Sequence, residues 1–389
     1  MEEQRIWSPR NELSSPRYLW TDAHGLCTLV SLFHATPPHR REERRRCLAE
    51  AELLVENVYK ALGTREACPY GGLRIGEEPD RDGQYFHYLM KWAFALSRLS
   101  KAFASSSSSA SSSPSPPSSS SSSVSSPSPS DEAKQTEREE REESKRKQRQ
   151  YHQAAVRLVK QIHRPFVVPG VGVLWKMKQD LSGPYPGYGL GALDHYDGYV
   201  TYRLIASSSY APYSSEEAAA ERAERRAGGQ ENLEEEIEEM RALVMKNYKR
   251  FVCEQDLGLG ESLWLTHWFP QERWAQHLRK TCLRTLDRMW VEGNGDTGSG
   301  GEEEGEGRGG GRGYFCRHPE MRETKYAFTN YGVSIGLQAV EMWPDRVKKL
   351  NGFFETYRSG DEYDTNAITH VMACSSWMPG VFLRQHASN

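Results

Sequence analysis

Apolar side chains recur every three or four residues through most of this 389-residue chain. Between residues 17 and 35 the apolar positions are Leu19, Ala23, Leu26, Val30 and Phe33. This spacing follows the 3.6-residue period of an α-helix and predicts one buried helical face. The same pattern predicts helices at residues 48–62, 82–103, 155–162, 199–205, 233–251, 259–268, 274–290, 326–342, 346–357 and 367–378. Short apolar runs around residues 167–174, interrupted by Pro169 and Gly170, predict one small β-hairpin.

About eleven helices with almost no strand place the chain in the all-α class and exclude a doubly wound sheet. Paired helices can be arranged as a solenoid or as a closed ring. A solenoid requires a repeat of roughly 33 to 47 residues in the sequence, and the chain has none. The pattern therefore favours a closed toroid of helical hairpins, in which Gly332 and Gly336 let two helices approach closely.

Three low-complexity inserts interrupt this pattern, at residues 104–150, 207–232 and 293–313. The first is Ser/Pro-rich and then highly charged, the second is rich in Ser, Glu, Ala and Arg, and the third in Gly, Glu and Arg. Such compositions bury too little apolar surface to offset the loss of chain entropy, so we expect disordered inserts. Helical pattern resumes within the charged run. The remainder suits a single globular domain spanning residues 1–389.

The net charge of the chain bears on which classes of partner it can bind. The formal net charge is −3 and the pI is near 6.5, which gives no basic field to hold nucleic acid or an anionic membrane. Seven cysteines lie scattered without a Cys-x-x-Cys pair, which disfavours a disulfide framework and a zinc ribbon. No apolar leader or membrane-length apolar run is present. We therefore expect a cytoplasmic protein that binds neither nucleic acid nor membrane.

Candidate chemistry concentrates in residues 172–203, where charged groups and aromatic rings fall in a loop-rich stretch. Loops on a rigid scaffold often carry binding and catalytic groups, so this stretch is interpreted as one wall of a pocket. Asp194 and Asp197 have a simpler alternative role, because aspartates often cap and charge the first turn of a helix. Asp82 has the same alternative at the start of the helix predicted from residue 82, and capping is favoured there.

Four short strings resemble a group of largely uncharacterised proteins within the six-hairpin glycosidase superfamily. They are RYLWTDA at residues 17–23, GGLRIG at 71–76, DGQYFHY at 82–88 with a following Lys-Trp pair, and WKM with DLS between 175 and 182. Members of the superfamily are (α/α)6 toroids and include glycoside hydrolases, unsaturated-uronyl hydrolases and N-acylglucosamine 2-epimerase relatives. A fifth string, DHYDG at residues 194–198, differs in the position of its histidine.

The resemblance implies a carbohydrate site at the end of the toroid where alternate loops gather. Glycoside hydrolysis needs two carboxyl groups across the scissile bond, and the candidates are Asp194 or Asp197 with Asp82; Asp22 or Asp180 are substitutes. The expected substrate-binding residues are Trp20, Asp22, Arg74, Tyr85, His87, Trp175, Lys176, Asp180 and His195. Lys91 lies four residues from His87 on the same helical face.

The function expected from these residues is hydrolysis of a small glycoside or oligosaccharide by a carboxylate pair, with no cofactor. One alternative keeps the fold but replaces hydrolysis by sugar epimerisation, with His87 or His195 moving a proton. Another is a non-catalytic protein that binds a glycan or acts as a scaffold. A metal site at Asp22 and His24, or at residues 194–197, is disfavoured because neither has metal-ligand spacing. Phosphate-binding and dinucleotide-binding motifs are absent from the sequence.

Overall fold

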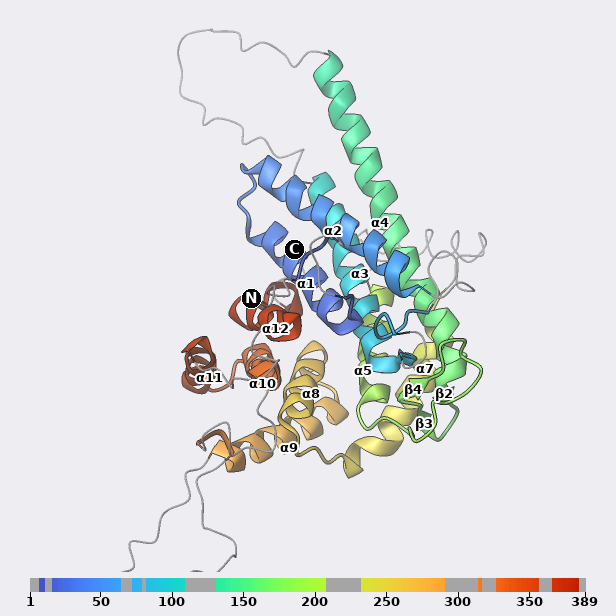
Figure 1. Cartoon of the computed structure of the whole chain (residues 1–389), viewed down its shortest axis with the longest axis vertical. Coiled ribbons are helices and arrows are strands. Elements are labelled where there is room, and N and C mark those ends of the chain that lie inside the picture. The colour runs from blue at the N-terminus through green and yellow to red at the C-terminus, as the bar shows by residue number, and fades with distance from the viewer. Residues whose placement is uncertain are drawn as a thin grey trace, which may run out of the picture.

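A computed structural model shows a predominantly helical protein (Figure 1). It describes residues 7–10, 16–63, 72–78, 82–108, 131–207, 232–290, 314–316, 327–356 and 366–384. The α-helices of these parts are α1 (Leu19–Ala35), α2 (Arg41–Leu62), α3 (Phe86–Ser108), α4 (Asp131–Phe166), α5 (Asp194–Ser207), α7 (Glu234–Asn247), α8 (Asp256–Trp268), α9 (Arg273–Trp290), α10 (Ala327–Ala339), α11 (Pro344–Thr356) and α12 (Ala367–Trp377). The predicted all-α class is confirmed for the described residues.

Helices that follow one another in the sequence pack as pairs. The pairs in contact are α1 with α2, α3 with α4, α5 with α7, α8 with α9, and α10 with α11. The first helices of these pairs also contact one another. These contacts join α1 to α3, α3 to α5, α5 to α8, α8 to α10, α10 to α12, and α12 to α1.

The two helices of a pair differ in how their sequence is buried. α1 buries side chains on nearly all sides, including Asp22 and His24, and α5 buries eleven of its fourteen residues. By contrast, α2 and α9 bury one stripe each, such as Leu48, Val55 and Leu62 in α2. An amphipathic helix covers a core with one face, whereas a helix that is buried all round lies within the core. The first helix of each pair therefore lies inside and its partner lies outside.

Two small antiparallel ladders shape the segment between α4 and α5. β2 (Val167–Val168) pairs with β3 (Gly172–Val173), and Gly170 adopts a left-handed φ of 68° in the turn. This confirms the predicted hairpin. β1 (Gln84–Tyr85) pairs with β4 (Lys176–Met177), so the chain before α3 is tied to the loop before α5.

This pairing corrects the predicted start of the third helix. α3 begins at Phe86, not at Asp82, because Gln84 and Tyr85 are extended and paired with β4. Asp82 therefore does not cap α3. Its carboxylate accepts a hydrogen bond from the Glu78 backbone N–H at 3.0 Å, which closes the preceding loop.

The charged run at residues 131–150 is also more ordered than its composition predicts. It forms the first part of α4, which extends well beyond the other helices in Figure 1. Ion pairs between Lys145 and Glu142, and between Arg146 and Glu143, lie along this exposed surface, and such spacing stabilises a solvated helix. The rest of the predicted inserts, at 109–130, 208–231 and 293–313, lies outside the described residues.

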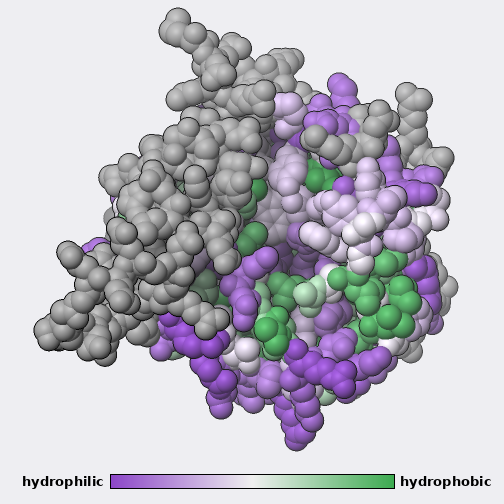
Figure 2. Space-filling model, turned by 60° about the horizontal axis from the view of Figure 1, so that its bottom comes forward, coloured by the Kyte–Doolittle hydropathy of each residue, from purple (hydrophilic) through white to green (hydrophobic). Residues whose placement is uncertain are grey.

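The surface shown in Figure 2 is mixed, with hydrophobic patches beside strongly hydrophilic ones and a hollow near the middle of that face. None of the helices in the described parts of the chain is both long and apolar enough to cross a membrane.

Glycines hold α8 and α10 close together. A Cβ atom on Gly260 would lie 2.3 Å from the Gly332 carbonyl oxygen, and one on Gly336 would lie 2.3 Å from the Gly260 carbonyl oxygen. Both contacts are with backbone, which cannot rotate out of the way. The predicted close approach at Gly332 and Gly336 is confirmed, and Gly260 is the position on α8 that it requires.

We predict that Gly260→Ala lowers the free energy of unfolding by about 1–3 kcal/mol, because overpacking must separate the two helices. Urea denaturation followed by circular dichroism measures this change. The matched control is Gly352→Ala in α11, where an added Cβ meets nothing within 4 Å. That substitution should raise stability by up to about 1 kcal/mol through helix propensity. Equal effects of the two substitutions would contradict the close contact.

Candidate functional site

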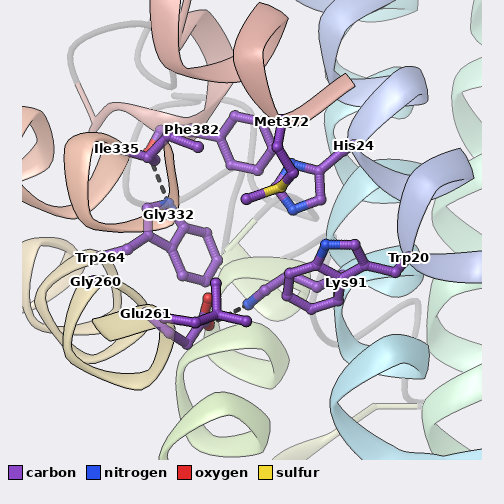
Figure 3. A pocket seen from close by; sticks show the side chains of 11 residues that line it. Trp20, His24, Lys91, Gly260, Glu261, Trp264, Gly332, Ile335, Met372 and Phe382 are labelled. Carbon is purple, nitrogen blue, oxygen red and sulfur yellow. Dashed lines mark hydrogen bonds and ion pairs between the residues drawn. The ribbon is translucent and has the colours of Figure 1, made fainter. Parts of the chain in front are cut away.

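A pocket of about 310 Å³, open to solvent, lies among α1, α3, α8, α10 and α12. Its lining residues are Trp20, His24, Lys91, Leu257, Gly260, Glu261, Trp264, Gly332, Ile335, Met372 and Phe382. Figure 3 shows Trp20 and His24 reaching in from α1, opposite Trp264 and Glu261 of α8.

Lys91 is the central charged group of this pocket. Its ammonium group donates to Asp197 Oδ1 at 3.2 Å. It also donates to the carboxylate of Glu261 (Figure 3). It also lies 3.9 Å from the centre of the Trp264 ring, within cation–π range. Burial alone would lower the pKa of Lys91, but the two carboxylates outweigh burial and raise it. Lys91 is therefore a permanent cation shared by two acidic side chains.

Asp197 lies in the first turn of α5, where it is 1% exposed. Burial raises its pKa to about 7, with a further upward contribution from Glu261 and a downward one from Lys91. Its Oδ1 atom also accepts from the Thr201 hydroxyl at 3.4 Å, while Oδ2 is buried without a hydrogen-bond partner. Asp197 thus holds Lys91 with one oxygen and leaves the other unsatisfied.

Asp194, one turn earlier, has the more strongly shifted carboxyl group. Burial, followed by the negative charge of Asp197, raises the pKa of Asp194 well above its ordinary value of 3.8. Its Oδ1 atom has no hydrogen-bond partner, and the nearest ring nitrogen, His87 Nδ1, is 3.9 Å away. This carboxyl group therefore keeps its proton to a higher pH than an ordinary aspartate does.

Aromatic rings form the opposite wall. His24 stacks on Phe382 with 4.9 Å between ring centres and lies 5.0 Å from the Trp20 ring. The indole N–H of Trp264 donates to the Phe382 carbonyl at 2.9 Å, which fixes the Trp264 ring. Burial, with help from the charge of Lys91, lowers the pKa of His24 to about 3, so the imidazole is neutral. Its Nε2 atom and the Trp20 indole nitrogen are buried without partners.

Two other histidines predicted for the site lie beside the carboxylates. His87 contacts the Trp20 ring edge-on at 5.7 Å, and burial together with Lys91 lowers its pKa to about 3. His195 lies between Asp194 and Asp197 in sequence, and burial lowers its pKa to about 4. Both rings are therefore neutral at physiological pH.

Tyr85, Trp175 and Lys176 form a second cluster beyond His87. The Tyr85 ring lies 6.1 Å from the ring of His87 and 5.6 Å from that of Trp175. Lys176 is buried beneath three tyrosine rings, with its ammonium nitrogen 4.9 Å from the Tyr85 ring centre. None of the three residues lines the pocket, so the structure places them at its outer edge.

Four predicted site residues have contacts with the scaffold instead. Asp22 accepts from Arg17 and from Trp7 at 3.0 Å each, and burial raises its pKa to about 6. Arg74 donates to the Ala61 carbonyl at the end of α2.

Asp180 and Asp82 are the other two. Asp180 is exposed and accepts from the Ser182 backbone N–H at 3.0 Å, and this hydrogen bond lowers its pKa. The contacts of Asp82 are with its own loop, as described above. In the described parts of the chain, no group of three or more His, Cys, Asp and Glu side chains is placed to hold a metal ion.

The sequence-based candidate list omitted four residues that now define the pocket: His24, Lys91, Glu261 and Trp264. The sequence indicated a role for Lys91, which lies on the same helical face as His87. Lys91 is part of a largely apolar helix, and a buried lysine needs a partner of opposite charge. The sequence indicated a role for Glu261 less strongly, since this residue follows Asp256 near the start of a buried helix. No sequence pattern predicts the partners of Lys91, because Asp197 and Glu261 lie 106 and 170 residues further along the chain.

No family model, curated protein or solved structure matches this chain.

The raised pKa of Asp194 makes a prediction about stability and pH. Between pH 3.8 and its raised pKa, the folded protein keeps a proton that the unfolded chain releases, so stability falls as pH rises. Asp194→Asn removes the cost of ionising a buried carboxyl group. The substitution should stabilise the protein by about 1 kcal/mol at about pH 8, but not at about pH 4.

Thermal unfolding across this pH range measures the difference. The control is Asp180→Asn, because the pKa of Asp180 is lowered and its charge is exposed; its substitution should give no gain at high pH. If Asp194→Asn destabilised the protein equally at both pH values, the protonated state of Asp194 would be refuted.

Proposed function

We propose that the described helices form an (α/α)6 toroid. The support is the cyclic order of contacts through α1, α3, α5, α8, α10 and α12, with α12 returning to α1. Several of these helices also have their N-terminal ends at the pocket. The residues that show this lie within the first two turns of their helices: Trp20, Lys91, Asp197 and Glu261. This arrangement resembles the six-hairpin glycosidase superfamily, whose sites lie at the corresponding end of the toroid.

We further propose that the pocket is the active site of a carbohydrate-active enzyme that hydrolyses a small glycoside. The observation that supports it is the convergence of Asp197 and Glu261 on Lys91 at a pocket walled by aromatic rings, with Asp194 one turn before Asp197 on α5. Glycoside hydrolysis needs one protonated and one ionised carboxyl group, and ring faces bind the apolar faces of sugars.

In this proposal the two roles belong to Asp194 and Glu261. Burial raises the pKa of Asp194, which suits this carboxyl group to protonate the leaving-group oxygen. Glu261 lines the pocket and pairs with the Lys91 ammonium group, and its carboxylate is placed to act as base or nucleophile. Asp197 positions Lys91. Asp82, the partner expected from the sequence, is replaced by Glu261 because Glu261 is the carboxylate that lines the pocket.

Proton NMR of the protein with a panel of glycosides tests this assignment. We expect a new anomeric signal with the wild type, and Asp194→Asn and Glu261→Gln should each reduce the rate by about 10²–10⁴-fold. Glu238→Gln, which removes an exposed carboxylate of α7, is the matched control and should retain the rate. A loss with Asp194→Asn and Asp82→Asn but not with Glu261→Gln would restore the pair expected from the sequence, and no hydrolysis of any glycoside would refute the proposed activity.

One observation favours epimerisation as the second candidate. His24 lines the pocket and its Nε2 atom has no hydrogen-bond partner, so this atom is placed to exchange a proton with a carbon next to a carbonyl. The same NMR experiment in deuterated buffer separates the two reactions. Epimerisation removes the signal of a ring proton without bond cleavage, whereas hydrolysis produces a new reducing end.

The charge balance of the pocket predicts which sugars are accepted. Among the described residues, the positive charge of Lys91 is already shared by Asp197 and Glu261, and His24 is neutral. A uronate would bring a further negative charge toward these carboxylates, which is costly in a partly buried site. We therefore predict that a neutral glycoside has a kcat/KM at least about tenfold above that of the matching uronide. A preference for the uronide would contradict this pairing of Lys91.

The described cysteines Cys27, Cys47, Cys253, Cys282 and Cys374 are all free thiols. Free thiols are typical of a reducing compartment, and this supports our proposal of a cytoplasmic location.

A further inference from the structure

The aromatic cluster outside the pocket forms a continuous series of rings with it. From Trp20 in the pocket wall, ring centres are separated by 5.7 Å to His87, 6.1 Å from His87 to Tyr85, and 5.6 Å from Tyr85 to Trp175. Exposure rises along the series, from 5% for Trp20 to 39% for Trp175. The rings therefore lead from the buried end of the site to solvent.

Trp175 is held in place by its backbone. Its N–H donates to the Gly189 carbonyl at 2.9 Å, and its carbonyl accepts from the Phe86 N–H at 3.1 Å. The next residue, Lys176, pairs with Tyr85 across the β1–β4 ladder. A ring that is fixed before binding loses little entropy when a ligand stacks on it.

Lys176 fixes the rings around Trp175. Its ammonium nitrogen lies 4.1 Å from the centre of the Tyr185 ring and 4.9 Å from the centres of both Tyr85 and Tyr188. The Tyr188 ring in turn meets the Trp175 ring at 65°, with 5.3 Å between centres. One cation thus holds three rings together by cation–π contacts, and the exposed part of Trp175 rests against a rigid aromatic base.

We infer that Trp175, with Tyr85 and Tyr188, is a second sugar subsite, and that the substrate is an oligosaccharide whose terminal unit enters the pocket while the next unit stacks on Trp175. This inference rests on the proposed hydrolase function and names its substrate class. The pocket is small and open to solvent, so units beyond the terminal one have to lie outside it. The aromatic series begins at Trp20 in the pocket wall and gives these units an apolar surface.

Chain-length dependence tests the inference. The substrates are the methyl glycoside of the preferred sugar and the matching disaccharide and trisaccharide, because a methyl group cannot reach the second subsite. For the wild type, kcat/KM should rise with the second unit. Trp175→Ala should lower kcat/KM about tenfold for the longer substrates, a loss typical of one aromatic contact, and leave the methyl glycoside unchanged.

Two further variants separate stacking from a general structural effect. Trp175→Phe keeps a ring and should retain most of the chain-length gain. Trp377→Ala removes a tryptophan that is 53% exposed at the end of α12 and should leave the whole series unchanged. An equal loss for all substrates, or no loss with Trp175→Ala, would overturn the second subsite.

A binding experiment tests the second subsite separately from the proposed hydrolase activity. If the wild type hydrolyses none of these compounds, the same trisaccharide is titrated into the wild type and Trp175→Ala and followed by NMR. Binding that Trp175→Ala weakens would keep the subsite and refute hydrolysis. Binding that is equal in both proteins, or absent from both, would refute the subsite as well.

Discussion

The buried ammonium group of Lys91 is the interaction on which the centre of this protein depends. It ties together α3, α5 and α8, because its partners Asp197 and Glu261 lie on the other two helices. Removing one member of a buried ion pair leaves the other charge uncompensated, at a cost of about 3–5 kcal/mol. Here two carboxylates would be left in the same small volume. The positions of three helices and the charge of the pocket are therefore set by one side chain.

The direction of the helices explains why so many acidic groups are tolerated at this end. Asp22, Asp194 and Asp256 all lie in the first turns of α1, α5 and α8, where the partial positive charge of a helix N-terminus stabilises a carboxylate. Asp256 shows the structural use of this effect, since it accepts from the Leu257 backbone N–H and from the hydroxyl of Thr329. Asp194 has no partner on Oδ1, and burial raises its pKa. The same helix position thus carries a hydrogen-bonded aspartate in one place and an aspartate with a raised pKa in another.

The sequence predicted the helices well because their signal is local. The stripe from Leu19 to Phe33 and the Pro169–Gly170 turn are each specified within a few residues. Asp82 was misassigned because its loop is fixed by β4, nearly a hundred residues later. Arg74 and Asp22 were expected to bind substrate, yet they pair with backbone and arginine on their own side of the fold. A charged residue in a motif looks the same in a sequence whether it faces a ligand or the scaffold.

The unsatisfied polar atoms argue that the pocket binds a polar ligand and is not a packing defect. Nearly all buried polar groups in proteins have a hydrogen-bond partner, but Trp20 Nε1 and His24 Nε2 of the pocket lining have none. The same is true of Asp194 Oδ1 and Asp197 Oδ2 on α5, the helix that holds Lys91 through Asp197. Their number at one site is costly, because each such atom has lost its water. An apolar ligand would leave that cost in place. A sugar has hydroxyl groups that can donate hydrogen bonds to these atoms or accept them. It also has apolar faces that can pack against the aromatic wall.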